Sequence, residues 1–271
     1  MSQDKIGIIA GEGMPPIYVA QGARELGHHV TILAIEGITS KDIEQYANSI
    51  YWCKLGRFSQ MITMCKKEGI FRVAMIGRVK QKLSLNPLNY DLRSIFVMMN
   101  LPDRRPQSIF NAIEAELAKE GIQIIDTRPY LKEFIPQPGL LTPRRPLTSE
   151  EEEAIRFGYP LAKYMADADI GQSIILDRRK AVIAVEAMEG TKDTIERVGK
   201  LGIPDSIVIK ASRSRQDFRF DIPTIGITTI EKIAEVKGSA LAITAGEMLF
   251  FQKKEAISFA EKHGIAIVAL D

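Results

Sequence analysis

The chain has 271 residues, a formal net charge of +2 and 45% hydrophobic residues. This length predicts two modest domains or one large α/β domain, each with a real hydrophobic core. The near-neutral charge argues against a dedicated nucleic-acid binder, because such proteins usually carry a basic surplus. The two cysteines, Cys53 and Cys65, are too few for a disulfide framework, and a reducing compartment is the simpler interpretation.

Two further features bear on where the protein works. Residues 1–30 contain no basic segment followed by an apolar core of the kind found in signal peptides. The longest apolar runs are far shorter than a membrane span. We therefore expect a cytoplasmic protein, and a peripheral contact with the inner face of the cytoplasmic membrane stays open.

Buried apolar runs alternate with helical patterns along the first half of the chain. Strands separated by helices of about 10–15 residues indicate crossover units and a parallel sheet. The first half is therefore predicted to be a Rossmann-like α/β domain. The expected strands are residues 6–10, 29–35, 49–55, 72–76 and 122–126, and the expected helices are residues 16–26, 58–68 and 106–120.

A break follows at residues 135–146, IPQPGLLTPRRP, which contain four prolines and a glycine. Proline lacks a backbone donor and restricts the residue before it, so neither a helix nor a central strand fits here. We interpret this segment as an exposed linker between a first domain, residues 1–134, and a second domain, residues 147–271. Ser149 suits the N-cap of a helix whose first turn, residues 150–153, is acidic.

The second half is predicted to be an α/β domain of its own type, with a mixed sheet. Apolar runs at residues 173–176 and 180–186 flank the polar residues 177–179, which is a hairpin signal. Further strands are expected at residues 206–210, 240–245 and 265–270, with helices at residues 191–200, near 229–236 and near 254–263.

The sequence AGEGMPP, residues 10–16, directly follows the first expected strand. Gly11 and Gly13 would let the backbone approach a ligand closely, and the next helix would point its N-terminal amides at an anion. A dinucleotide fingerprint needs a third glycine where this chain has Pro16. Glu36, at the end of the second strand, would still meet a ribose. A structural turn and a nucleotide-binding loop both stay open.

The sequence MIGRVK, residues 75–80, lies where another expected strand ends. Ligands of open parallel sheets gather at the carboxyl ends of strands. Gly77 would permit a close approach there, while Arg78 and Lys80 would hold phosphate oxygens. The alternative is a pair of solvated cations on a loop.

The sequence AVEAMEGTKD, residues 184–193, runs from a strand into the start of a helix. Mg²⁺ is usually held by a small number of carboxylates together with water and substrate phosphate, and Glu186 and Glu189 would supply such ligands. Helix capping is the alternative, with Thr191 at the N-cap and Asp193 in the first turn. Capping does not explain Glu186 inside an otherwise apolar strand.

The stretch KASRSRQDFRFDIPTIG, residues 210–226, concentrates four cations and two aspartates. Alternate residues of an extended chain face opposite sides, so Phe218, Phe220 and Ile222 would pack inward. A solvated strand with paired charges is the alternative for the other face. The rigid turn of residues 223–226 favours a functional site.

The polar face of that stretch would carry Asp217, Arg219 and Asp221, with Arg213 and Arg215 continuing it. Two carboxylates on either side of a cation suit a phosphate and a metal together. Each charge-assisted contact can contribute on the order of 1.5–3 kcal/mol.

Taken together, these stretches resemble the UDP-2,3-diacylglucosamine pyrophosphatase family of the LpxI type. The resemblance extends along essentially the whole chain in the same order, which is more specific than any single motif. The strongest part is KASRSRQDFRFDIPTIG. The other features that carry it are IGIIAGEGMPP, LGRF, MIGRV, GLLTPRRP, ADIGQSIIL and AVEAMEGTKD.

The resemblance implies a Rossmann-like N-terminal domain, a C-terminal α/β domain and a substrate held between them. The implied reaction splits UDP-2,3-diacylglucosamine, with water, into UMP and 2,3-diacylglucosamine 1-phosphate in lipid A synthesis. It also implies a requirement for Mg²⁺ or Mn²⁺. The functionally critical carboxylate of the family precedes PTIG, and here it is Asp221.

We assign Asp221 to metal binding or to general-base work on water, with Asp217 as a second catalytic carboxylate. Glu186 and Glu189 are the further expected metal ligands. The expected phosphate clamps and other substrate-binding residues are Gly11, Gly13, Arg78, Lys80, Gln172, Thr191, Lys210, Arg213, Gln216, Arg219 and Thr224.

The expected partners are a UDP-diacylglucosamine-type glycolipid as substrate, a membrane surface contacted transiently, and a second copy of the chain in a homodimer; no nucleic acid is expected. Residues 95–101 and 248–251, apolar stretches beside cations, are the candidate membrane contacts. Two other functions stay open. One is a nicotinamide-dependent oxidoreductase that uses Gly11, Gly13 and Glu36. The other is a protein that binds a nucleotide or lipid precursor without turnover.

Overall fold

The chain divides into two compact units, and a short segment of the second half belongs to the first of them. Unit 1 comprises Met1–Lys132 and Phe218–Asp221, and unit 2 comprises Glu133–Asp217 and Ile222–Asp271. Lys80 and Asp221, two of the predicted site residues, lie outside the described residues. The structure, a computed structural model, describes residues 4–79, 90–103, 106–220 and 222–271.

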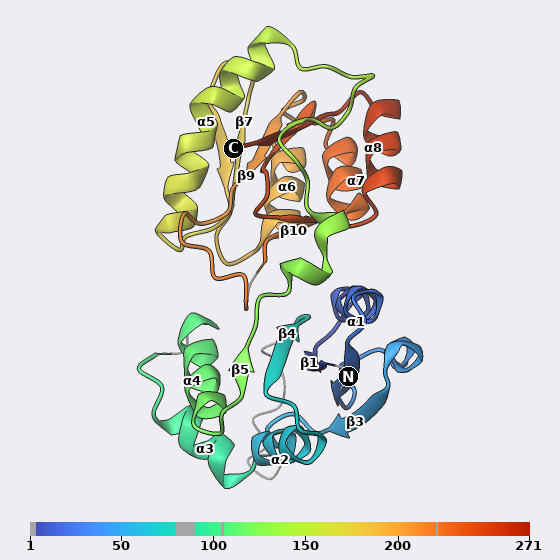
Figure 1. The fold of residues 1–271 in the computed structure, drawn as a ribbon. Coiled ribbons are helices and arrows are strands. Elements are labelled where there is room, and N and C mark those ends of the chain that lie inside the picture. Colours follow the sequence, from blue (N-terminus) through green and yellow to red (C-terminus); the bar gives the residue numbers. More distant parts are fainter. Residues whose placement is uncertain (1–3, 80–89, 104–105, 221) are drawn as a thin grey trace. The chain divides into compact units, whose positions relative to one another are not determined.

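The sheet of unit 1 is built, within these ranges, from five strands that all pair in parallel. Its strand order, β3-β2-β1-β4-β5, is that of the first five strands of a doubly wound dinucleotide-binding sheet. The predicted alternation of strands and helices is therefore confirmed (Figure 1). The strands are β1 Lys5–Ala10, β2 His29–Ile35, β3 Ser49–Cys53, β4 Arg72–Ile76 and β5 Gln123–Ile124.

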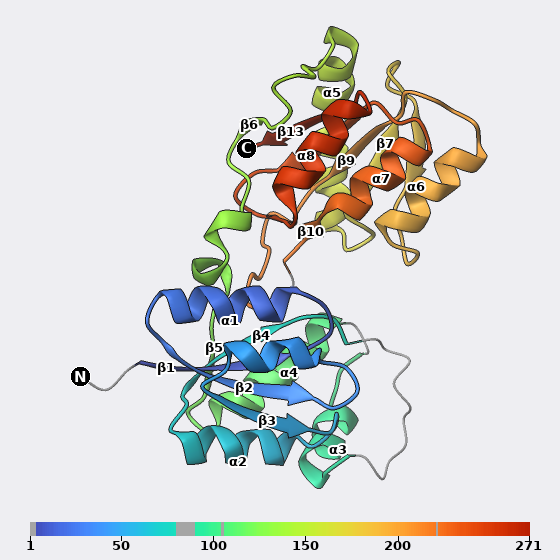
Figure 2. The same cartoon turned by 90° about the vertical axis from the view of Figure 1, so that its right-hand side faces the viewer.

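Helices cover both faces of this sheet (Figure 2). Helix α1 lies on one face, and α2 and α4 pack on the other through an apolar cluster that includes Met61, Leu117 and Ile124. Helix α3 was not predicted from the sequence. The helices are α1 Pro15–Glu25, η1 Lys41–Tyr46, α2 Phe58–Glu68, α3 Leu92–Met99, α4 Pro106–Ala118 and η3 Arg128–Tyr130, followed by η4 Lys132–Phe134.

Unit 2 contains the predicted mixed sheet, with the order β6-β13-β11-β9-β7-β8 among the described strands. The central strands β9, β11 and β13 are parallel, whereas β6, β7 and β8 pair antiparallel. The hairpin signal at residues 177–179 connects β7 to β8, as expected. The strands of unit 2 are β6 Gly139–Leu140, β7 Ser173–Leu176, β8 Val182–Val185, β9 Ile207–Lys210, β10 Thr224–Ile225, β11 Ala240–Thr244, β12 Leu249–Phe250 and β13 Ala266–Leu270.

The helices of unit 2 also form two layers (Figure 2). Helix α5 packs on one face of the sheet, in a cluster with Ile155, Ile207 and Ile209. The opposite face carries α6, α7 and α8 over Val208 and Leu241. These helices are α5 Ser149–Asp167, α6 Thr191–Lys200, α7 Ile227–Glu235 and α8 Lys253–Lys262.

The proline-rich segment is largely exposed, as its composition predicts, but it is not unpaired. Gly139–Leu140 pair with β13 at the edge of the sheet, and Thr142 is fully buried. An edge strand tolerates nearby prolines because only one of its sides needs backbone donors. The expected absence of regular pairing is therefore wrong, and the domain boundaries at residues 134 and 147 stay a prediction.

A buried ion pair ties this segment to α5. Thr148, rather than Ser149, is the N-cap, and it forms a capping box with Glu151. Glu151 is fully buried, and its carboxylate accepts two hydrogen bonds from Arg145 at 2.7 and 2.9 Å. Burial opposes ionisation of Glu151, but Arg145 and the Thr148 amide outweigh it and hold the pKa of Glu151 below its ordinary value.

Replacing Glu151 with glutamine is expected to lower the free energy of unfolding by about 3 kcal/mol, because Arg145 would lose its compensating charge. The depressed folded-state pKa means that the contribution of Glu151 is present above its unfolded pKa of about 4.3. It should be lost as the pH falls below that value. Urea unfolding at neutral and at acidic pH measures this difference.

The control is Glu152→Gln, an exposed carboxylate in the same first turn. Its effect on the free energy of unfolding should stay within about 0.5 kcal/mol. Equal losses of the free energy of unfolding for the two variants at neutral pH would show that the buried ion pair contributes no more to stability than the exposed carboxylate does.

Candidate functional site

Four polar side chains of unit 2 meet where β9 ends and both β7 and α6 begin. Lys210 closes β9 and lies opposite Ser173 in the β7–β9 register, while Thr191 opens α6. Lys210 Nζ donates to Thr191 Oγ1 at 2.6 Å, and Thr191 Oγ1 donates to Glu186 Oε2 at 2.9 Å. Ser173 Oγ lies 3.1 Å from Thr191 Oγ1. We call these four residues the Lys210 cluster.

The Lys210 cluster is largely withdrawn from water. Lys210 is 7% exposed, Glu186 is 9% exposed and Ser173 is fully buried. An ammonium group and a carboxylate tolerate such burial only when they are hydrogen-bonded, and the hydroxyl of Thr191 links the two. Because ligands of α/β sheets bind at the carboxyl ends of parallel strands, the cluster offers a cation where a phosphate would bind.

A close backbone contact brings Glu186 to the cluster. A Cβ atom on Gly171 would lie 2.1 Å from the carbonyl oxygen of Glu186, so the residue at this position has to be glycine. The N–H of Glu186 donates to the carbonyl of Ser173 at 2.8 Å. The glycine of the ADIGQSIIL stretch therefore holds Glu186 beside the start of β7.

A second polar group, which the sequence analysis did not identify, lies just beyond Lys210. Ser212 is fully buried, and its N–H donates to Thr244 Oγ1 at 3.2 Å while its hydroxyl donates to the carboxylate of Glu247. Lys163 of α5 donates to the Ser212 carbonyl at 3.1 Å and pairs with Glu247 at 3.3 Å. These residues are far apart in the sequence, so no local pattern links them.

The following residues are fixed to the end of α5. The carboxylate of Asp167 accepts hydrogen bonds from the N–H and hydroxyl of Ser214 at 2.6 and 2.7 Å. These two bonds hold the pKa of Asp167 below its ordinary value. Arg213 donates to Asp169 at 2.6 Å. The first part of the charged stretch is therefore anchored on unit 2.

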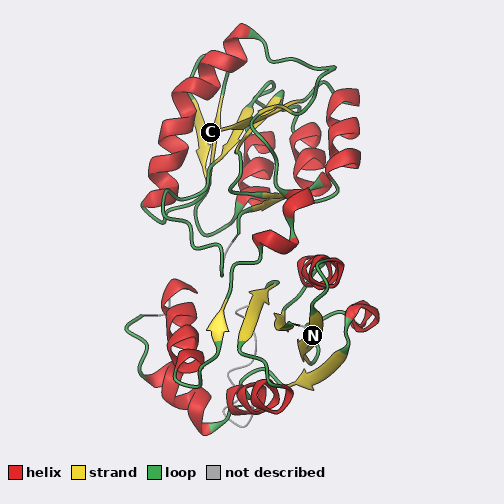
Figure 3. Ribbon diagram, viewed as in Figure 1, coloured by secondary structure: helices red, strands yellow, loops and turns green. Residues whose placement is uncertain are grey.

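The extended strand predicted through residues 217–222 is wrong. Residues 214–215 and 218–220 are turns, and the described residues between β9 and β10 form neither helix nor strand (Figure 3). Phe218–Phe220 count with unit 1 rather than with unit 2. Their aromatic side chains find burial against residues distant in the sequence, and an alternation rule cannot foresee such a tertiary contact.

Three contacts hold this aromatic segment, Phe218–Phe220, on unit 1. Two of them involve α4, and the third involves the residue that opens η3. They are Phe220 stacked on Phe110 with ring centroids 5.1 Å apart, Arg219 in a bidentate ion pair with Glu114, and the Arg128 guanidinium 3.7 Å from the ring centre of Phe218.

The glycine loops of unit 1 lie against each other at the carboxyl ends of β1 and β4. A Cβ atom on Gly11 would come within 2.7 Å of the Gly77 backbone. Glu12 and Arg78 exchange backbone hydrogen bonds of 2.8 and 3.1 Å. Both glycines therefore serve the contact between two loops, which favours the structural turn among the two alternatives.

Helix α1 also offers an anion few amides. Its first two residues, Pro15 and Pro16, have no N–H group, and the N–H of Ile17 donates to the Met14 carbonyl at 2.9 Å. A nicotinamide dinucleotide would need those amides for its pyrophosphate. The contacts of Gly11 and Gly13 with substrate stay predictions.

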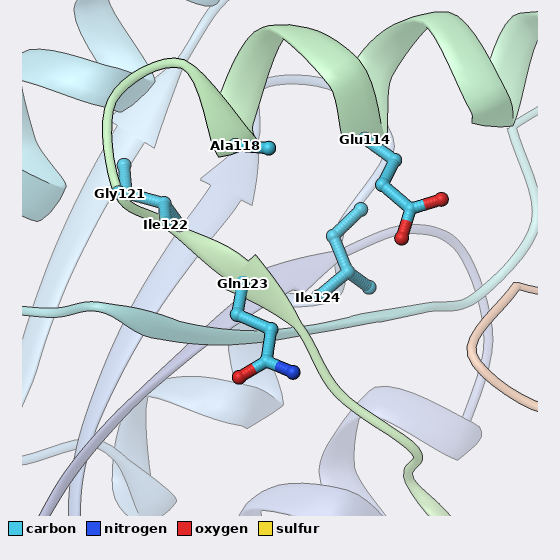
Figure 4. A pocket seen from close by; sticks show the side chains of 6 residues that line it. All are labelled: Glu114, Ala118, Gly121, Ile122, Gln123 and Ile124. Atoms are coloured by element: carbon cyan, nitrogen blue, oxygen red, sulfur yellow. The ribbon is translucent and has the colours of Figure 1, made fainter.

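Two surface pockets lie away from the Lys210 cluster. The first, of about 220 Å³, lies between the end of α4 and β5 and is lined by Glu114, Ala118, Gly121, Ile122, Gln123 and Ile124 (Figure 4). The second, of about 280 Å³, is lined by residues of unit 2 that include Arg145, Arg178 and His263. Glu114 is notable because its carboxylate also holds Arg219.

Family models match almost the whole chain, with the LpxI N-terminal domain on residues 5–134 and the LpxI C-terminal domain on residues 137–268. The chain belongs to the LpxI family. One relative is the UDP-2,3-diacylglucosamine pyrophosphatase LpxI of Caulobacter vibrioides. It is 25% identical over 280 residues, which cover 98% of each chain.

Two solved structures show a distant likeness to this LpxI-family chain. An isoflavone reductase is 10% identical, with a TM-score of 0.30, and the match covers 99% of this chain and 79% of that one. A glycinamide-RNase-transformylase T from Mycobacterium tuberculosis is also 10% identical, with a TM-score of 0.26, and the match covers 68% of this chain and 44% of that one. Likenesses of this size carry no argument about function.

The structure brings together three of the residues predicted for the LpxI-type site, namely Glu186, Thr191 and Lys210. Arg213 and Arg219 lie in the loop that follows, each paired with a carboxylate of its own unit. The other predicted residues are dispersed, with Arg78 exposed and Asp217 half-buried. The Gln172 carbonyl accepts from the Ala211 N–H, and the Gln216 side chain accepts from the Arg213 N–H. The Thr224 hydroxyl donates to the Ile222 carbonyl.

The described residues do not by themselves form the metal site that the LpxI resemblance implies. No three His, Cys, Asp or Glu side chains among them lie close enough to hold an ion. Glu189 accepts hydrogen bonds from Arg197 and from the Ala187 N–H, so its carboxylate is already engaged. Glu186 is bonded to Thr191. We therefore assign no catalytic step to a metal, and the metal ligands stay predictions.

Replacing Lys210 with methionine keeps the apolar stem and removes the charge. Binding of inorganic pyrophosphate should weaken by about tenfold or more, because a charge-assisted contact contributes about 1.5–3 kcal/mol. Isothermal titration calorimetry measures the change. Lys200→Met, at the exposed end of α6, is the matched control and should bind like the wild type. Unchanged binding by the folded Lys210 variant would remove Lys210 from the phosphate site.

Proposed function

We propose that this protein hydrolyses the pyrophosphate of UDP-2,3-diacylglucosamine to UMP and 2,3-diacylglucosamine 1-phosphate, or lipid X, in lipid A biosynthesis. The observation that carries the proposal is the match over 98% of the chain with a relative named as the UDP-2,3-diacylglucosamine pyrophosphatase. The Lys210 cluster supports it, because a buried cation at the carboxyl ends of the strands suits a phosphate-bearing substrate.

The hydrolysis consists of three events. A water oxygen attacks one phosphorus atom, the bond from that phosphorus to the bridging oxygen breaks, and the leaving phosphate keeps the electron pair. Lys210 would stabilise the negative charge that develops on the phosphate oxygens. A carboxylate would take the proton from the attacking water, and we assign this role to Asp221.

The test is direct incubation of the purified protein with UDP-2,3-diacylglucosamine. UMP and the lipid phosphate should appear in equal amounts, as measured by liquid chromatography and mass spectrometry. Substrate binding without release of UMP would favour a binding protein without turnover. In a parallel incubation with added nicotinamide cofactor, oxidation or reduction of that cofactor without UMP release would favour the oxidoreductase.

We also propose that turnover depends on Mg²⁺ or Mn²⁺. When bound, such an ion neutralises phosphate oxygens and helps to position the substrate. Exhaustive chelation should abolish release of UMP, and added Mg²⁺ should restore it. Full activity of the chelated protein, with its metal content checked by elemental analysis, would contradict the metal requirement.

The assignment of Asp221 predicts a large effect of a small change. Asp221→Asn keeps the size of the side chain and removes its negative charge, so turnover should fall by about two or more orders of magnitude. Asp217→Asn, four residues earlier, should cause a smaller loss. Lys210 would still hold phosphate, so substrate affinity should change little. Near-normal turnover of a folded Asp221→Asn variant would falsify the assignment.

A glycolipid substrate raises the question of how the protein reaches a membrane, and α3 supports a transient contact. Leu92, Phe96 and Met99 are 85%, 61% and 80% exposed, and their spacing places them on one side of the helix. None of the helices within the described ranges has the length and apolar character needed to cross a bilayer. Residues 248–251 are buried, so the second candidate contact is wrong.

Vesicle flotation tests this contact. The protein should float with vesicles that contain phosphatidylglycerol, and the double variant Phe96→Ser, Met99→Ser should float less, because it loses apolar surface. Phe157→Ser, an exposed aromatic on α5, is the matched control. Absence of flotation of the wild type with any lipid composition would remove the idea. The homodimer stays a separate prediction.

A further inference from the structure

The loop between β9 and β10 is fixed at two places on unit 2, yet its middle packs on unit 1. At its start, Ser212 and Ser214 are held by Glu247 and Asp167. At its end, β10 pairs with β12. The aromatic segment Phe218–Phe220 between these fixed places belongs to unit 1.

The contacts of the aromatic segment are better suited to fixing a position than to stabilising a fold. Arg219 and Glu114 are each about a third exposed, and ion pairs at such sites contribute little to stability. Their bidentate geometry does specify the place and orientation of the guanidinium. The parallel stacking of Phe220 on Phe110, with planes 12° apart, adds a second geometric constraint from the same helix.

Phe110 and Glu114 are one helical turn apart on α4, so a single rigid element supplies both constraints. Helix α4 in turn packs on the sheet of unit 1 through Leu117. The position of the aromatic segment is therefore fixed relative to the core of unit 1. In the sequence it directly precedes Asp221, the proposed catalytic carboxylate.

We propose that Glu114 and Phe110 are positioning residues for the hydrolysis. They hold Arg219 and Phe220, the two residues that directly precede Asp221 in the sequence. The proposal rests on the proposed function and uses only the place of Asp221 in the sequence. It also gives Arg219 a role that differs from the phosphate clamp predicted from its charge.

The expected signature is a loss of turnover with little change in substrate affinity. A misplacement of about 1 Å in a catalytic group can cost about a hundredfold in rate. Glu114→Gln and Phe110→Leu should therefore lower kcat for release of UMP by about ten- to a hundredfold, while KM stays within about threefold. A purely structural role would instead lower the midpoint of thermal unfolding and leave kcat of the folded fraction unchanged.

The deciding experiment is a charge exchange. Glu114→Arg and Arg219→Glu should each lose turnover, and the double variant should regain most of it, because the pair is restored in reverse. If Arg219 instead held phosphate, the double variant would stay inactive, and that result would overturn the proposal. Glu120→Gln is the matched control: it removes a carboxylate that pairs with Arg93 and Lys66 and should turn over like the wild type.

Wild-type activity separates this inference from the proposed function. If the wild type releases no UMP, the proposed function fails and the positioning role fails with it. If the wild type is active and folded Glu114→Gln and Phe110→Leu keep its kcat, only the positioning role is overturned. Thermal unfolding of each variant shows whether the chain is folded at the assay temperature.

Discussion

The burial of one ammonium group, that of Lys210, is the constraint on which the architecture of unit 2 around the candidate site depends. A charge at the carboxyl end of β9 can leave water only if hydrogen-bonding partners meet it. The hydroxyl of Thr191 connects it to the carboxylate of Glu186, and this requires α6 to begin beside β9. Glu186 directly follows β8, and its backbone passes so close to Gly171 that no side chain would fit at position 171. The β7–β8 hairpin, Gly171 and the start of α6 thus all help to place the partners of the buried Lys210 ammonium group.

The charged stretch of residues 210–226 combines several local demands rather than one continuous polar face. Lys210 belongs to the buried cluster, Arg213 pairs with Asp169 at the end of α5, and Arg219 pairs with Glu114 on α4. Each of these three cations thus has a carboxylate or hydroxyl partner in a different part of the chain. The stretch concentrates charge because its cations pair with three separate parts of the chain. Its residues are divided between the two units.

The sequence predicts the fold well where a pattern is local. Apart from β6, the strands of both sheets, the hairpin between β7 and β8 and the range of α6 all follow from periodicity and turn residues, although the N-cap of α6 is Gly190 rather than Thr191. It fails where distant residues decide the outcome. The alternating pattern around Phe220 predicts one face of a strand. Phe220 lies instead in a turn that counts with unit 1, where it stacks on Phe110. The group around Ser212 has no sequence signature, and β6 pairs despite its prolines because it lies at an edge.

The position of bound UMP tests the role of the Lys210 cluster most directly. A crystal structure of the protein grown with UMP should show a phosphate oxygen about 2.8 Å from Lys210 Nζ, the distance of a charge-assisted hydrogen bond. The ammonium should have turned from Thr191 toward that oxygen. Phosphate density at the loops of Gly11 and Gly77, with Lys210 still bonded to Thr191, would contradict the proposed phosphate site.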